Sequence, residues 1–380
     1  MMAAPAVELG FELRVLAEAP GVSATGAVAR STVGDYTDLD TLAEFAAGVD
    51  VLTFDHEHVP TDLLSELRSR GVNIQPPPEA LVHAQDKLLM RAAVERLGLP
   101  NPRWAPVRSS AELDAFGRST GWPVVLKTPR GGYDGKGVIV IESPAEVDAA
   151  AEWFTGGELL AEEHVRFTRE LSVLVARTPS GQVRTWPVVH SIQIDGVCDE
   201  VIAPAPDLSP DTAAAATAAA VKIAQELGVT GVMAVEMFET PGTPAGFLIN
   251  ELAMRPHNSG HWTMDGSVTG QFEQHLRAVL DLPLGATAAT APVAVMKNYL
   301  GGTNADIYSA YRAALAAEPA VKIHFYGKGV RPGRKIGHVN ALGRAGEPLD
   351  EVRGRASRTA ALLRDGHQGT PSTEPRKDSQ

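Results

Sequence analysis

The segment Leu248–Thr263, LINELAMRPHNSGHWT, holds the densest group of reactive side chains in the chain. It opens as an apolar run typical of a buried strand and then changes abruptly to polar residues. An apolar strand that ends in polar chemistry is how α/β enzymes hold a site on a rigid element, so this segment predicts an active site. The side chains concerned are a carboxylate, a guanidinium, an amide and two imidazoles: Glu251, Arg255, Asn258, His257 and His261.

A second carboxylate, Glu236, lies in the preceding apolar run GVMAVEMFET, and the turn-rich PGTPAG separates the two runs. If the runs pair as a hairpin, Glu236 and Glu251 project from adjacent strands toward the same space. Two carboxylates this close need a cation to offset their repulsion, and oxygen ligands beside nucleotide phosphates favour magnesium. The pair therefore predicts a magnesium site.

The loop TPRGGYDGKG between the strand-like runs WPVVLK and GVIVI is rich in glycine, which allows backbone N–H groups to cradle phosphate oxygens. A Walker loop runs from a strand to a helix, whereas this loop joins two strands, which excludes that motif. Two interpretations stay open: a flap over a nucleotide with Lys127 at its entrance, or an ordinary hairpin loop. The acidic pair Glu162 and Glu163 favours the flap, because neighbouring strand residues face opposite ways. That alternation suits a hinge that binds adenine and ribose through its backbone and one carboxylate.

The elements that must position these groups open with a helix, MMAAPAVELG, a strand, FELRVLAEA, a helix at about Asp40–Gly48 and a strand, VDVLTF. Doubly wound domains open on a strand and a Gly-rich turn, so we expect that a first strand and turn are missing. A fold variant that begins with a helix is the alternative. The segment Asn73–Ala80, NIQPPPEA, is typical of a linker, and a single helix, ALVHAQDKLLMRAAVERLGL, is expected after it.

Further along, four short β-branched runs between Gly121 and Arg177 predict a small α+β module: WPVVLK, GVIVI, ELLAEEHV and ELSVLVAR. Ser209 as N-cap and Pro210 at the first helical position predict a long Ala-rich helix that ends before Gly228. From Gly366 onward the chain has few apolar residues, which predicts a disordered tail.

Taken in order, Lys87, Lys127, GGYDGKG, EEHV, Glu170, Glu236 and Asn250-Glu251 resemble the nucleotide site of ATP-grasp ligases. The sequence motif RPHNSGHWT, together with RPGRKIGHVN further on (Arg331–Asn340), is similar to the motifs of one family of these ligases. This family is the N5-carboxyaminoimidazole ribonucleotide synthetases of purine biosynthesis, and the resemblance runs from Met1 to Leu363.

The resemblance implies a mixed α/β and α+β fold with an ATP-grasp core. It implies a Rossmann-like pre-ATP-grasp domain at 1–80 that lacks its first strand, and an ATP-grasp domain at 81–285 whose small lid spans about 115–175. A C-terminal domain at 286–365 and a tail at 366–380 complete the expected organisation. It also implies a homodimer in the cytoplasm.

The reaction implied by the resemblance joins bicarbonate to 5-aminoimidazole ribonucleotide with ATP and Mg²⁺, and it gives the N5-carbamate, ADP and phosphate through carboxyphosphate. The residues expected to bind ATP are Lys87, Lys127, Gly131, Gly132, Tyr133, Asp134, Gly135, Lys136, Gly137, Glu162, Glu163, His164, Val165, Glu170, Gln193, Asn250 and Glu251. Those expected to act on bicarbonate and the amine are Arg255, His257, Asn258 and Tyr133, and those expected to bind the ribonucleotide are Glu57, Arg255, Arg334 and Lys335. Glu236 and Glu251 are the expected metal ligands.

Composition narrows the function classes. The net charge of −12 disfavours binding to nucleic acid or to anionic membranes by bulk charge, and no apolar run has the length of a membrane-spanning helix. Cys198 is the only cysteine, which excludes a disulfide framework. His257 and His261 have the spacing of a zinc pair, but Asn258 stands where a metalloprotease has glutamate. Two alternatives to the carboxylating ligase stay open, a formate-dependent transformylase and a nucleotide-binding paralogue without turnover.

Overall fold

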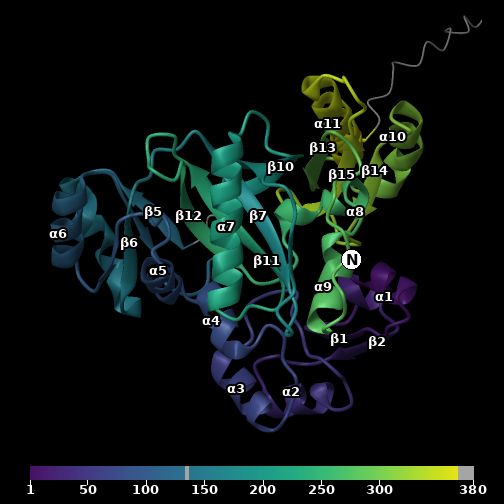
Figure 1. Ribbon diagram of the computed structural model, residues 1–380. Coiled ribbons are helices and arrows are strands. Elements are labelled where there is room, and N and C mark those ends of the chain that lie inside the picture. The colour runs from purple at the N-terminus through teal and green to yellow at the C-terminus, as the bar shows by residue number, and fades with distance from the viewer. Residues whose placement is uncertain (133–136, 367–380) are drawn as a thin grey trace, which may run out of the picture.

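The computed structural model describes residues 1–132 and 137–366, and it is built around one large sheet and two smaller ones (Figure 1). The first domain holds a two-stranded parallel sheet, β1-β2, in which Arg14 pairs with Arg30. Its elements are α1 (Ala3–Glu8), β1 (Arg14–Ala17), the 3-10 turn η1 (Ser23–Gly26), β2 (Arg30–Val33), α2 (Leu39–Ala46) and α3 (Thr61–Ser69).

The opening helix, strand and helix of the first domain are confirmed, but the strand predicted at VDVLTF is wrong. There the chain forms only a single parallel bridge, between Leu52 and Ile74. Leu52 and Phe54 are nevertheless buried, so the apolar pattern predicts their burial correctly but not the lack of strand pairing.

The single helix expected after the linker is two helices, α4 (Pro78–Gln85) and α5 (Lys87–Arg96). Asp86 separates them in an extended conformation, and its carboxylate accepts hydrogen bonds from the backbone N–H groups of Leu88 and Leu89. Capping of α5 by Asp86 therefore breaks a run with otherwise helical propensity.

A four-stranded sheet with the order β3-β6-β4-β5 forms the small module that we call the lid. Its core contains Leu113 of the covering helix and Leu126 of the central strand. The run ELSVLVAR, expected in this module, belongs instead to the large sheet as β7. The lid elements are β3 (Trp104–Val107), α6 (Ser110–Thr120), β4 (Val124–Lys127), β5 (Val138–Ile141), the 3-10 segment η2 (Pro144–Gly156) and β6 (Leu159–Glu163).

In the described part of the chain the large sheet has nine strands, in the order β12-β11-β7-β9-β10-β13-β15-β14, with β8 paired to β7. Its strands are β7 (Arg169–Arg177), β8 (Val183–Thr185), β9 (Val189–Ile194), β10 (Val197–Ala203), β11 (Gly231–Glu239), β12 (Phe247–Ala253), β13 (Ala294–Leu300), β14 (Lys322–Phe325) and β15 (Lys335–Leu342). The sheet thus runs without interruption from the predicted ATP-grasp domain into the predicted C-terminal domain.

Helices cover both faces of this sheet. The long helix α7 (Pro210–Glu226) lies across one face (Figure 1) and buries Ala216 and Ile223 against Val173 and Val235. Ser209 caps it by accepting from the N–H of Thr212, as the sequence predicts. The remaining elements are η3 (Asn258–Gly260), α8 (Thr263–Gly266), α9 (Gln271–Val279), η4 (Ile307–Ala310), α10 (Tyr311–Ala317) and α11 (Leu349–Asp365).

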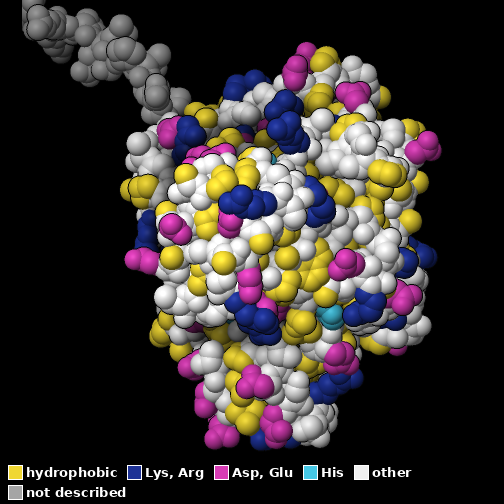
Figure 2. Space-filling view, turned by 90° about the vertical axis from the view of Figure 1, so that its left-hand side faces the viewer, with side chains coloured by type: hydrophobic (Ala, Val, Ile, Leu, Met, Phe, Trp, Pro, Cys, Tyr) yellow, Lys and Arg dark blue, Asp and Glu magenta, His cyan; other side chains and the backbone are white. Residues whose placement is uncertain are grey.

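The charge on one face of the molecule and the length of its helices complete the description. On the face shown in Figure 2, basic and acidic side chains are interspersed. In residues 1–132 and 137–366, no helix is long and apolar enough to cross a membrane.

Candidate active site

The predicted carboxylate hairpin is present. Strands β11 and β12 are antiparallel, and Glu236 lies directly opposite Glu251 in their register. The register shifts immediately afterwards, because Met237 pairs with Ile249 and leaves Asn250 as an extra residue on β12. A bulge of this kind re-aims the neighbouring side chain, and here that neighbour is Glu251.

The electrostatics at Glu236 favour a bound cation. Burial, together with the nearby carboxylates of Glu251 and Glu170, raises the pKa of Glu236 to about 8, although Lys335 and Arg255 offset part of the rise. His257 Nε2 lies 3.6 Å from Glu236 Oε1, but burial holds the pKa of this imidazole well below its usual range. A neutral imidazole supplies no positive charge, so the carboxylates keep their need for a cation.

The donor set fits a hard cation. Within residues 1–132 and 137–366, no three or more His, Cys, Asp or Glu side chains converge as a metal cage. Magnesium is usually held by one or two carboxylates together with phosphate oxygens and water. The Glu236–Glu251 pair is therefore suited to a magnesium ion that arrives with a nucleotide.

Several predicted nucleotide contacts meet at the edge of this hairpin. Lys87 Nζ lies 3.5 Å from Glu251 Oε1 and 3.4 Å from the carbonyl oxygen of Gly131 in the glycine loop. Gly131, Gly132 and Gly137 all have φ near +70°, a conformation that favours glycine. The loop residues Tyr133, Asp134, Gly135 and Lys136 lie outside the described residues.

The two hinge carboxylates face opposite ways, as their positions on β6 predict. Glu162 is buried, and burial alone would raise its pKa; Arg91 and Lys127 nevertheless lower it to about 2. Lys127 Nζ lies 2.7 Å from Glu162 Oε2, so the predicted phosphate lysine is held by the hinge. Glu163 instead bonds to Arg103, at 3.0 Å from its Nε. His164 is exposed and Val165 half-buried at the end of this strand.

Two further nucleotide-side residues lie together on β7 and β9. Gln193 Nε2 donates to Ser191 Oγ at 3.0 Å, and Ser191 pairs with Glu170 across the two strands. Burial raises the pKa of Glu170 to about 7, and the hydrogen bond from Gln193 offsets part of the rise. This pairing joins Gln193, whose role the sequence left least defined, to a predicted ribose contact.

Residues of the second-substrate group are tied to the first domain. Arg255 Nε lies 2.7 Å from Glu57 Oε2, and the other oxygen of Glu57 accepts from the backbone N–H of Met254 at 3.1 Å. Glu57 thus fixes the end of β12 and orients Arg255. Lys335 starts β15, and its charge acts on Glu236 and His257. Arg334 is exposed in the turn before it and donates to the carbonyl oxygen of Gly329.

The backbone of His257 is clamped by Gln271, a fully buried residue that the sequence did not single out. Gln271 Oε1 accepts from the N–H of His257 at 2.8 Å, and its Nε2 donates to the carbonyl oxygen of His257 at 2.8 Å. The same Nε2 lies 2.8 Å from His261 Nδ1. One amide therefore fixes the backbone of His257 and the imidazole of His261.

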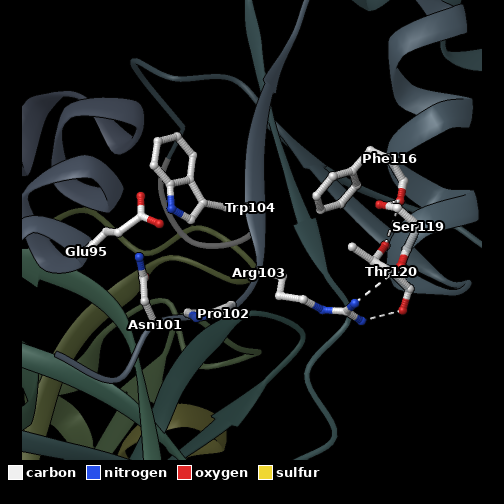
Figure 3. Close-up of a pocket in the computed structure, with 8 residues that line it drawn as sticks. All are labelled: Glu95, Asn101, Pro102, Arg103, Trp104, Phe116, Ser119 and Thr120. Carbon is white, nitrogen blue, oxygen red and sulfur yellow. Dashed lines mark hydrogen bonds between the residues drawn. The ribbon is translucent and has the colours of Figure 1, made fainter. Parts of the chain in front are cut away.

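A groove of about 430 Å³ lies behind the hinge, between α5 and the lid (Figure 3). Arg103 crosses it and donates to the carbonyl oxygens of Ser119 and Thr120 at the end of α6. Arg103 also donates to Glu163 through Nε, so the protein itself holds this guanidinium. The residues that line the groove include none of the predicted site residues.

The sheets, the lid and the facing carboxylates define a member of the ATP-grasp class. The ATP-grasp domain family matches residues 92–272, the ribonucleotide synthetase preATP-grasp domain matches residues 1–85, and the phosphoribosylaminoimidazole carboxylase C-terminal domain matches residues 294–352.

Full-length comparisons narrow the class. The N5-carboxyaminoimidazole ribonucleotide synthase of Mycobacterium tuberculosis is 51% identical over 343 residues, which cover 89% of this chain and 80% of the relative. The synthetase structure from Thermus thermophilus has a TM-score of 0.85 at 35% identity, over 94% of this chain and 95% of the other. The Aspergillus clavatus synthase with ADP and 5-aminoimidazole ribonucleotide has a TM-score of 0.84 at 29% identity, over 96% and 95%.

The chain belongs to the N5-carboxyaminoimidazole ribonucleotide synthase family. It is an ATP-dependent carbon–nitrogen ligase that carboxylates 5-aminoimidazole ribonucleotide in purine biosynthesis.

Proposed function

We propose that this site uses bicarbonate as the carboxyl donor and that the predicted residues divide between the two substrates. The observation that supports the proposal is the direct pairing of Glu236 with Glu251, with Lys87 beside one carboxylate and His257 beside the other. The site thus places groups suited to phosphate next to groups suited to a second reactant.

The reaction proceeds in two steps. An oxygen of bicarbonate attacks the γ-phosphorus of ATP, the bond from that phosphorus to the bridging oxygen breaks, and carboxyphosphate and ADP form. The amine nitrogen of the ribonucleotide then attacks the carboxyl carbon, the bond from carbon to the phosphate oxygen breaks, and the nitrogen releases a proton. Phosphoryl transfer depends mainly on positioning and charge neutralisation, which is why the site is rich in lysine and carboxylate.

On the ATP side, Lys87 and Lys127 contact the phosphates, the glycine loop covers them, and β6 receives the adenine. Glu170 with Gln193 serves the ribose. Glu236 and Glu251 would hold Mg²⁺, which when bound neutralises phosphate charge and offsets the repulsion between the two carboxylates.

On the side of the second substrate, the orientation of Asn258 follows from its neighbours. Asn298 Nδ2 lies 2.7 Å from the carbonyl oxygen of Cys198, and a carbonyl can only accept, so the amide of Asn298 has one orientation. The same Nδ2 lies 2.9 Å from the amide of Asn258, which must therefore turn its Oδ1 toward it. The Nδ2 of Asn258 is left to donate to an anionic carboxyl group.

The other roles on this side follow from charge. Arg255, fixed by Glu57, and His257 face bicarbonate and the amine, while Glu57 also serves the ribose hydroxyls. Arg334 and Lys335 bind the phosphate of the ribonucleotide, because a guanidinium and an ammonium are suited to that anion. The homodimer and the cytoplasmic location implied by the resemblance stay predictions; light scattering of the purified protein tests the first.

The test is the variant Glu251→Gln, which keeps the shape of the side chain and removes its charge. We expect ADP release with bicarbonate and ribonucleotide to fall at least ~100-fold, as when comparable electrostatic groups are lost elsewhere. Glu239→Gln, on the same hairpin but paired with Arg169, is the matched control and should stay active. Turnover of Glu251→Gln near the wild-type rate would exclude the metal assignment. ADP release by the wild type with formate, and none with bicarbonate, would exclude the proposed donor.

A further inference from the structure

Arg91, on the inner side of α5, is a fully buried arginine at the junction of three elements. Its Nε donates to Glu162 Oε1 on the hinge strand of the lid. Its Nη1 donates to Asn101 Oδ1 at 2.9 Å and to the carbonyl oxygen of Ile249 at 2.7 Å, and its Nη2 donates to the carbonyl oxygen of Asn250 at 2.9 Å. One guanidinium thus bonds the lid and the β12 strand at the same time.

On the lid side, the contact continues to a predicted phosphate ligand. Glu162 accepts from Arg91 through Oε1 and lies 2.7 Å from Lys127 Nζ through Oε2. The carboxylate therefore transmits the position of Arg91 to Lys127. Removal of Arg91 would leave Glu162 with one cation and change where Lys127 is held.

On the β12 side, the contact ends beside a predicted metal ligand. Ile249 and Asn250 directly precede Glu251, and Asn250 is the extra residue of the bulge. β12 is an edge strand of the large sheet, so its outward carbonyl groups have no strand partner, and Arg91 supplies donors to two of them at the bulge. The bend that aims Glu251 is thus held by the same side chain that holds Glu162.

Only a planar guanidinium, with donors that point in several directions, makes this set of contacts. A lysine has one nitrogen at the end of a flexible stem, so it can reach Glu162 or the carbonyl oxygens of β12 but cannot hold both in one plane. A buried arginine usually forms a structural ion pair within the fold. The joint contact with the hinge and the bulge goes beyond such a pair.

We propose that Arg91 is a positioning residue that fixes Lys127 of the lid relative to Glu251 of β12 for phosphoryl transfer from ATP. The inference rests on the proposed function for the roles of those two residues. Misplacement of reacting groups by ~1 Å can cost ~100-fold in rate, so a tie between the two sides of the phosphate has a direct kinetic effect.

The experiment compares Arg91→Lys, Arg91→Met and Glu162→Gln with Arg355→Met. Arg355 forms an ion pair with Glu347 in the C-terminal part of the chain and serves as the matched control. Initial rates of ADP release are measured while ATP and the ribonucleotide are varied separately. We expect the Arg91 and Glu162 variants to lower kcat by ~10- to 100-fold and to raise the KM for ATP, with the KM for the ribonucleotide unchanged. Arg355→Met should keep both KM values and kcat.

Each outcome decides the proposal. If Arg91→Met does not fold, Arg91→Lys and Glu162→Gln decide it, because both keep a polar group in the buried site. Wild-type kinetics in folded variants, or equal increases in both KM values, would overturn the positioning role and leave a structural ion pair. The proposed function fails separately: if the wild type releases ADP with another carboxylic acid and not with bicarbonate, the same kinetic pattern is measured with that acid.

Discussion

Replacement of Glu236 by glutamine should stabilise the protein in the absence of metal while it removes activity. Glu236 has a usual pKa of 4.5 when unfolded and a pKa of about 8 in the fold, where burial and two neighbouring carboxylates oppose its ionisation. Between these two values the native state binds more protons than the unfolded state, so the free energy of unfolding falls as pH rises from 4.5 to 8. Glutamine carries no proton equilibrium and avoids this loss.

The magnitude follows from the two pKa values. At pH 7 a shift from 4.5 to about 8 costs the native state ~3 kcal/mol. The Glu236 side chain is 20% exposed, and solvent contact reduces the cost of a charge there, so we expect a gain of ~1–3 kcal/mol in Glu236→Gln at pH 7 and slightly more at pH 8. Toward pH 4.5 and below the gain should vanish, because the carboxyl group is then protonated in the unfolded chain as well as in the fold.

The assay is urea denaturation of wild type and Glu236→Gln at pH 5 and pH 8 with a metal chelator and no nucleotide. Glu239→Gln is the control, because it breaks an ion pair with Arg169 and should lower stability. Added Mg²⁺ with ADP should stabilise the wild type more than Glu236→Gln, since the cation relieves the repulsion only where the carboxylate is present. A difference between wild type and Glu236→Gln that is the same at both pH values, or a less stable variant at pH 8, would refute this reasoning.

Substitutions at four other positions test separate parts of the site and the packing of the lid. Lys335→Ala should raise the KM for the ribonucleotide and leave that for ATP unchanged, while Lys127→Ala should weaken ATP use; a raised KM for ATP alone in Lys335→Ala would show that the two sites are exchanged. Asn298→Asp should raise the KM for bicarbonate more than Asn298→Ala, because a carboxylate facing the Cys198 carbonyl oxygen repels it and disturbs the amide beside it; equal effects would contradict the orientation argument. Gly117→Ala should destabilise the lid by ~1–3 kcal/mol in thermal denaturation, since a Cβ there would lie 2.2 Å from the Trp122 ring, and an unchanged melting temperature would contradict that packing.

The carboxylate hairpin could be predicted because its information is local. Two apolar runs, a turn-rich connection and one carboxylate in each run determine an antiparallel pair, and the observed register places Glu236 opposite Glu251. The helix from Pro210 was predictable for the same reason, since Ser209 and Gly228 mark both ends. In each case the deciding residues lie within one stretch of chain.

Other features depend on contacts that no local pattern reports. The strand β7 has the same apolar pattern whether it joins the lid or the large sheet, and only tertiary pairing with β11 decides. The sequence does not reveal the break at Asp86, because the residues on both sides have helical propensity and only the capping bonds of Asp86 interrupt the helix. Arg91 gave a faint signal, as it lies among Met90, Ala93 and Val94 on the buried side of α5, where a charged residue needs partners.

The side chains that contact the second-substrate residues could not be predicted from the sequence for a different reason. Asn298 and Gln271 are ordinary polar residues in a strand and a helix, and each contacts its target from a distant part of the sequence. A single sequence shows neither contact. The glycine loop and the roles of its residues 133–136 stay predictions.

The unbroken large sheet has a mechanical consequence for catalysis. Strands β11 and β12 carry Glu236 and Glu251, the proposed metal ligands, and β15 begins with Lys335, yet all belong to one ladder of hydrogen bonds. The pairing of β10 with β13 joins the two ends of the sheet, so it sets the spacing of Glu236 and Glu251 from Lys335, the residues proposed for the nucleotide and for the ribonucleotide. The lid shares no strand pairing with that ladder in the described residues, and Arg91 bonds it to β12 through Glu162. The spacing between Lys127 of the lid and this ladder therefore depends on side-chain contacts such as that of Arg91 with Glu162, and strand pairing does not set it.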